Sequence, residues 1–74
     1  MTLTVEFDRE EDGRWIAEIP EIPENPGCMV YGASREDSLG RAEALALRVL
    51  ADRIEHGEAS PEDASVSFIV TAAA

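Results

Sequence analysis

The chain has 74 residues, with 16 acidic and 6 basic side chains and a formal net charge of −10. A domain of this size buries only about 60% of the surface its unfolded chain exposes, so we expect self-association to a dimer or tetramer. The six basic residues are all arginines, and this balance disfavours nucleic acids and anionic membranes as partners. A protein partner is expected to be basic; the alternative is that the charge only keeps the protein soluble.

The cysteine content and the apolar runs bear on the compartment. The single cysteine, Cys28, cannot form an internal disulfide. The longest apolar run, Ala44 to Leu47, is far shorter than the roughly 20 residues that a membrane span needs. No secretory segment is visible, and we expect a cytoplasmic protein without a membrane association.

The first two predicted elements form a hairpin. Residues 2–8 and residues 14–19 both alternate apolar and polar side chains, which is the pattern of half-buried strands. Asp12-Gly13 between them is a turn signal, because glycine accepts a positive φ. We therefore predict an antiparallel pair of strands, with Trp15 on the core side.

A loop and a short third strand follow. The segment Pro20–Gly27 contains three prolines, which remove backbone donors and interrupt a strand. Residues 28–31 are predicted to form the third strand, which Gly32 ends.

A long helix is predicted over about residues 35–56. Ser34 suits the N-cap, and Asp37 stands where the acid of a capping box would lie. Gly57 suits the first position after the helix. Two i,i+4 ion pairs are expected, Asp37 with Arg41 and Arg48 with Asp52. The apolar stripe of this helix consists of Leu39, Ala42, Ala46, Leu47, Val49, Leu50 and Ile54.

Residues 65–71 alternate again and are predicted to form a fourth strand, with Val66, Phe68 and Val70 facing the core. A right-handed crossover through the helix would lay this strand beside and parallel to the first. The chain, residues 1–74, is thus predicted to be one α+β domain of order β-β-β-α-β. Its four-stranded sheet has the order 3-2-1-4, with the helix on one face.

The opposite face of this sheet is the predicted contact surface. It would carry apolar side chains among polar ones, and the sheet has two free edge strands, which together favour self-association. The apolar residues expected there are Ile16, Met29, Tyr31 and Ile69.

Carboxylates on the first two strands raise the question of a metal site. Ribonuclease H chemistry needs clustered carboxylates that hold two divalent ions. Glu6, Asp8 and Glu18 alternate with the core residues, as solvated charges do, so we expect no metal there. The acidic turn Glu10–Asp12 does not have the spacing of an EF-hand loop.

No catalytic site or cofactor is expected. Cys28 and His56 are the only pair for a nucleophile with a histidine base, and nothing beside Cys28 in the sequence would activate its thiol. Trp15 and Tyr31 are aromatic and suit partner anchors. Trp15 is expected in the core because it shares a face with Ala17, while Tyr31 suits either role.

The first 58 or so residues resemble the HicB family, the antitoxins of type II toxin–antitoxin systems. The resemblance lies in the ordered combination of several short segments followed by an alanine-rich helix. These segments are Gly13–Glu18, Pro20-Glu21-Ile22-Pro23, Pro26-Gly27-Cys28 and Gly32–Asp37.

The resemblance implies a partial ribonuclease-H-like fold that binds and blocks HicA, a small basic toxin that cleaves mRNA. The acidic loop residues Glu21 and Glu24 are candidate contacts to a protein partner or to a second copy of the chain. Glu24-Asn25-Pro26 are extra relative to the usual family loop, which puts contacts there in doubt. The chain also lacks the C-terminal DNA-binding domain of many members, so no direct DNA binding is expected. The alternative is a homo-oligomeric scaffold or regulatory domain without a toxin partner.

Overall fold

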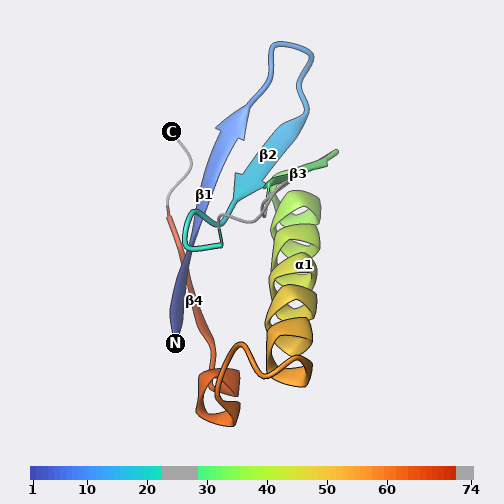
Figure 1. Ribbon diagram of the computed structural model, residues 1–74. Helices are drawn as coiled ribbons and strands as arrows, with labels where there is room; N and C mark the ends of the chain where they lie inside the picture. Colours follow the sequence, from blue (N-terminus) through green and yellow to red (C-terminus); the bar gives the residue numbers. More distant parts are fainter. Residues whose placement is uncertain (23–28, 72–74) are drawn as a thin grey trace.

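A sheet of four strands and one long helix make up the fold, in a computed structural model that describes residues 1–22 and 29–71, apart from the side chain of Asp63. The strand order is β3-β2-β1-β4, with β4 parallel to β1 and the other neighbours antiparallel. The predicted α+β arrangement with sheet order 3-2-1-4 is therefore confirmed (Figure 1). In chain order the elements are β1 (Thr2–Arg9), β2 (Trp15–Glu18), β3 (Met29–Gly32), α1 (Arg35–Glu55), the 3₁₀ turn η1 (Pro61–Ala64) and β4 (Ser67–Val70).

The hairpin between β1 and β2 projects beyond the N-terminal end of α1 (Figure 1). Gly13 has a φ of +92°, which is the conformation that the Asp-Gly turn signal predicts. Asp12 accepts hydrogen bonds from the backbone N–H and the guanidinium of Arg14, and the backbone bond is the main cause of the lowered pKa of Asp12. The turn thus fixes the pairing of β1 with β2.

Helix α1 begins at the predicted cap. Ser34 Oγ accepts a hydrogen bond from the backbone N–H of Asp37 at 3.0 Å. The Asp37 carboxylate in turn accepts from the N–H of Ala33, one residue before the position that a capping box uses. This hydrogen bond, and then the ion pair with Arg41 at 3.2 Å, lower the pKa of Asp37.

The C-terminal end of α1 is closed by a Schellman motif. Gly57 has a φ of +71°, and its N–H donates to the carbonyl of Ile54. The N–H of Glu58 donates to the carbonyl of Arg53 at 2.8 Å. The helix therefore ends where the glycine at position 57 predicts.

The predicted ion pair between Arg48 and Asp52 is wrong. The Asp52 carboxylate instead lies 3.2 Å from Nδ1 of His56, one turn further along. The backbone carbonyl of Asp52, and then its carboxylate, raise the pKa of His56. Arg48 has no ion-pair partner among residues 1–22 and 29–71.

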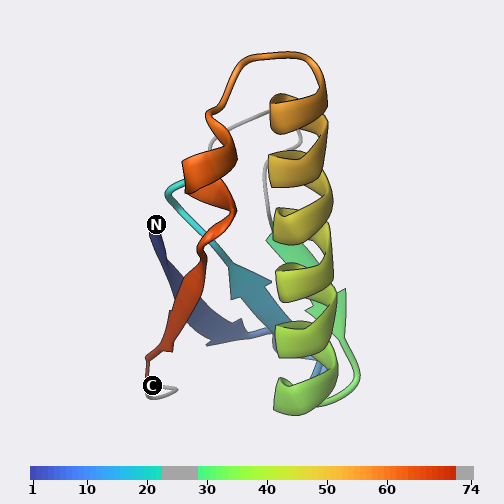
Figure 2. The ribbon, with the colours of Figure 1, turned by 90° about the horizontal axis from the view of Figure 1, so that it is seen from below.

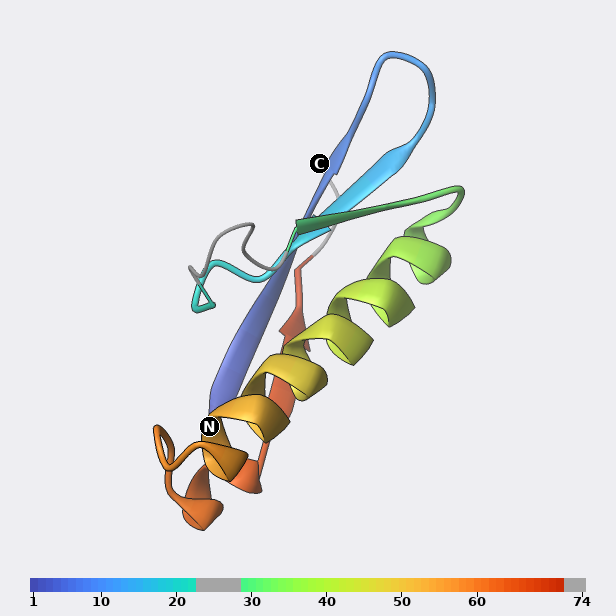
Figure 3. The same ribbon diagram turned by 45° about the vertical axis from the view of Figure 1, so that its right-hand side comes forward.

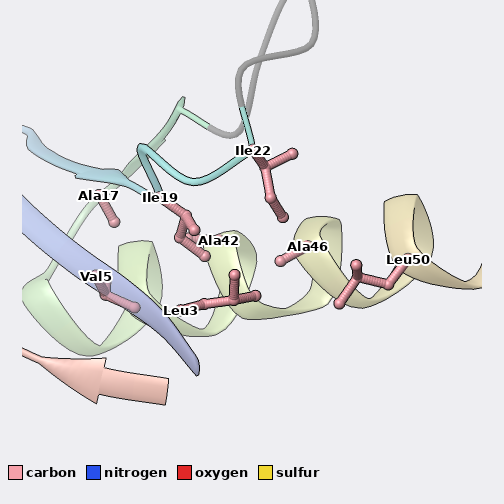
Figure 4. Close-up of a cluster of buried hydrophobic side chains, with 8 residues drawn as sticks. All are labelled: Leu3, Val5, Ala17, Ile19, Ile22, Ala42, Ala46 and Leu50. Atoms are coloured by element: carbon pink, nitrogen blue, oxygen red, sulfur yellow. The ribbon is translucent and has the colours of Figure 1, made fainter. Parts of the chain in front are cut away.

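The core lies between α1 and the sheet face that it covers (Figures 2 and 4). Ile22 is buried in it although it follows the end of β2, because a turn closed by the bond from Ile22 N–H to the Ile19 carbonyl folds it back. The buried apolar side chains are Leu3, Val5, Ala17, Ile19, Ile22, Ala42, Ala46 and Leu50.

Helix and sheet are in close backbone contact at Gly32. A Cβ added to Gly32 would lie 2.4 Å from the backbone nitrogen of Ser38, so only glycine fits here. Ser38 is fully buried, and its Oγ donates to the carbonyl of Arg35 at 2.9 Å. The close contact ties β3 to the first turn of α1.

One prediction about the apolar surfaces is wrong. Leu47 was placed on the apolar stripe of the helix, yet it is 49% exposed. Val70 lies beside the buried Val5 on the covered face, as predicted, yet it is 39% exposed, because α1 packs mainly over β2 and β3 and leaves β4 less covered. The turn η1 lies between α1 and β4, and β4 is shorter than the predicted strand 65–71.

Candidate partner-binding surface

The sheet surface that points away from α1 is the candidate site, and we call it the open face. Its residues alternate with the core residues along each strand. The strand register brings four rows of side chains together there. These rows are Met29 and Tyr31 on β3, Ile16 and Glu18 on β2, Thr2, Thr4, Glu6 and Asp8 on β1, and Ile69 on β4.

Three carboxylates converge at the centre of the open face. Glu6 on β1 is directly opposite Glu18 on β2, and Asp8 is opposite Ile16. Side chains that face each other in this way have Cβ atoms about 5 Å apart, and like charges at such positions destabilise a sheet. The turn at Asp12-Gly13 therefore holds Glu6 and Glu18 in an unfavourable pairing.

No cation within the described residues compensates these charges. Neither Glu6 nor Glu18 forms an ion pair there, and the Asp8 carboxylate accepts only the neighbouring N–H of Arg9. The three side chains belong to exposed residues. Arg14, which lies over Tyr31 on the same face, pairs with Asp12, so Glu6, Asp8 and Glu18 form a negative cluster without an ion pair in the described chain.

A shallow hollow of about 430 Å³ lies among these carboxylates. Its apolar walls come from Ile16 and Met29, so an aliphatic chain with a cationic end would contact both kinds of group. This hollow is lined by Glu6, Phe7, Asp8, Ile16, Glu18 and Met29.

Apolar side chains flank the hollow on both sides. Met29 is 49%, Tyr31 42% and Ile69 55% exposed, whereas Ile16 between them is half-buried. The guanidinium of Arg14 lies 4.6 Å from the centre of the Tyr31 ring. The four predicted apolar residues therefore share one face, with the acidic hollow in the middle.

Of the two predicted loop contacts, the structure describes Glu21 but not Glu24. Glu21 Oε1 accepts a hydrogen bond from the N–H of Thr4 at 3.0 Å, and this bond lowers the pKa of Glu21. Glu21 thus accepts a hydrogen bond from a backbone N–H of β1 at a point beyond the end of β2, which is a structural role. Glu24 and the inserted residues Glu24-Asn25-Pro26 lie outside the described residues, as does Cys28.

Trp15 and His56 do not line the hollow. Trp15 is half-buried on the helix side of the sheet, where its ring meets Phe7 edge to face at 6.3 Å and Arg9 lies 5.4 Å from its centre. His56 is exposed at the end of α1. Within residues 1–22 and 29–71, no three histidine, cysteine or acidic side chains are placed to hold a metal ion together.

Fold and site together define a small α+β domain with a helix on one face of its sheet and an acidic, partly apolar surface on the other. No family model, no curated protein and no solved structure matches the chain. None of the described helices combines the length and the apolar character needed to cross a bilayer.

Proposed function

We propose that this protein is a HicB-like antitoxin module that binds and neutralises a small, basic, mRNA-cleaving toxin of the HicA type, in the cytoplasm and without catalysis of its own. The observation that carries the proposal is the facing pair Glu6 and Glu18, with Asp8 beside it, on one face of the sheet and without an ion-pair partner in the described chain. The residues that resemble the HicB family support the same reading.

The electrostatics explain how such a surface would act. A nuclease that cleaves mRNA needs a basic surface to hold the phosphate backbone, and a carboxylate cluster competes for that surface. Each lysine or arginine placed in the acidic hollow would relieve the repulsion between Glu6 and Glu18. The flanking Met29, Tyr31 and Ile69 would add apolar contact area.

The test is co-expression with a small basic protein encoded by the adjacent gene, followed by size exclusion and an RNA-cleavage assay. A stable complex with suppressed cleavage is expected. The double variant Glu6→Lys/Glu18→Lys should lose the complex and restore cleavage. The matched control Glu36→Lys/Glu55→Lys changes the net charge equally on exposed helix positions and should retain inhibition. Inhibition that survives in the Glu6→Lys/Glu18→Lys variant would contradict the proposal.

The alternative function is a homo-oligomeric scaffold or regulatory domain, and the exposed Met29, Tyr31 and Ile69 favour it. The salt dependence of association distinguishes these two functions. Self-association through the open face would bring two acidic hollows together, so added salt should strengthen it by screening. Binding of a basic partner should weaken with salt. Sedimentation at low and high ionic strength distinguishes them.

A further inference from the structure

A second surface feature lies at the edge of the sheet, where β3 runs beside the N-terminal half of α1 (Figure 3). A groove of about 610 Å³ opens there, lined by Val30 and Tyr31 of β3 and by Arg41, Ala44, Leu45 and Arg48 of α1. Its floor is apolar, and its two arginines are exposed. We call it the β3 groove.

The position of the groove suits an added strand. β3 is the outermost strand, so the backbone groups on its outer edge have no strand partner in the described chain. Val30 is paired with the buried Ala17 and hence faces α1. An extended segment beside β3 would point alternate side chains onto Ala44 and Leu45 in the same way.

Arginines gather around this edge in a chain that is otherwise strongly acidic. Arg41 and Arg48 stand on the helix side, and Arg14 lies over Tyr31 on the open face, so three of the six arginines surround β3. Arg41 already pairs with Asp37 and Arg14 with Asp12, so Arg48 is the arginine of these three that has no acidic partner in the described chain. The charged side chains that line the β3 groove are both cations, whereas those that line the acidic hollow are all carboxylates.

We propose that the β3 groove binds an extended acidic segment of a partner protein, which adds a fifth strand beside β3 and places carboxylates on Arg41 and Arg48. Along the helix these arginines are seven residues, or roughly 10 Å, apart. Carboxylates at positions i and i+4 of a strand are roughly 13 Å apart on one face, within reach of the two long side chains. The residue between them on that face would cover Leu45.

A second copy of this chain is a poorer occupant. Two-fold pairing of β3 with its equivalent would set the two α1 helices antiparallel, with Ala44 and Leu45 near the axis. Arg41 would then face Arg48 of the other copy twice, without an acid between them. The like charges at these contacts disfavour that dimer. The acidic segment is also distinct from the basic partner of the open face, so this inference does not rest on the proposed function.

The test uses a capped heptapeptide, Thr-Glu-Thr-Val-Thr-Glu-Thr, and its counterpart with lysine in place of glutamate. Titration into the ¹⁵N-labelled protein, followed by amide chemical shifts, should show saturable binding of the acidic peptide. The shifts should centre on Met29–Gly32 and on residues 41–48. The lysine peptide should not perturb these residues.

Variants then assign the contact. Two variants should bind the acidic peptide less tightly, because each substitution removes a charge-assisted hydrogen bond. They are Arg48→Glu alone and the double variant Arg41→Glu/Arg48→Glu, whose affinity should fall by about tenfold or more. Both positions are exposed, so folding should be kept. Arg9→Glu, on the projecting hairpin, is the matched control and should change the affinity less than about twofold. Three results would overturn the proposal: no saturation at millimolar peptide, equal binding of the lysine peptide, or concentration-dependent shifts at β3 without peptide, which would indicate a second copy.

Discussion

The two faces of the sheet differ in what their side chains do. On the face under α1, small and branched apolar residues interdigitate, and Gly32 brings the helix against the strand. On the open face, Glu6 faces Glu18, which stabilises nothing within the described chain. The covered face therefore accounts for the fold. The like-charge pair on the open face opposes folding, and residues that oppose folding are expected at surfaces that serve a function.

The largest expected effect is on the covered face, at Gly32. Gly32→Ala should lower the free energy of unfolding by about 3 kcal/mol, because the new methyl group would lie 2.4 Å from the Ser38 nitrogen and the backbone must move. Urea denaturation followed by circular dichroism measures this. A loss below about 0.5 kcal/mol would show that helix and strand are not in such close contact.

Truncations compare the two faces directly. Leu3→Ala removes a buried side chain and should cost about 3 kcal/mol. Ile69→Ala removes a side chain that is 55% exposed and should cost less than about 0.5 kcal/mol. Equal losses in thermal or urea unfolding would mean that the open face is covered by other parts of the molecule.

Gly40 sharpens the contrast with Gly32. An added Cβ at Gly40 meets nothing within 4 Å, and the residue is exposed within α1. Gly40→Ala should therefore raise the unfolding free energy by up to about 1 kcal/mol through helix propensity alone. If this variant is instead destabilised, the outer surface of α1 is occupied.

The smallest expected effect is the pH dependence of the helix cap. The folded-state pKa of Asp37 is lowered by the Ala33 N–H and by Arg41, so its contribution is present above the unfolded pKa and is lost as the pH falls through the folded pKa. Asp37→Asn should flatten the acid side of the stability profile. Glu36→Gln, one residue earlier, serves as the control, and an equal flattening there would contradict the assignment.

Most of the fold could be predicted from the sequence, because its signals are local. Alternation along residues 2–8, the Asp12-Gly13 turn, Ser34 and Gly57 each determine backbone geometry within a few residues. The exposure of Leu47 and Val70 could not be predicted, because it depends on where α1 crosses the sheet. Ile22 was missed for a similar reason, since a turn after β2 returns it to the core.

The candidate surfaces were only partly predictable. Alternation placed Glu6 and Glu18 on one face, but only the register makes them direct neighbours. That register follows from the length of the turn, which is a signal in the sequence. The β3 groove was missed because Arg48 was paired with Asp52 by spacing, whereas Asp52 pairs with His56.

The most direct test of the open face is one comparison of affinity, between the native chain and Glu18→Lys, for the basic protein of the adjacent gene. Glu18→Lys replaces a like-charge pair with an opposite one and should raise stability by about 0.5 kcal/mol. Titration calorimetry should nevertheless show affinity reduced by about tenfold or more, since the carboxylate that meets the partner is reversed. Unchanged affinity in a folded variant would contradict the account, because the repulsive pair Glu6 and Glu18 would then have no role in partner binding.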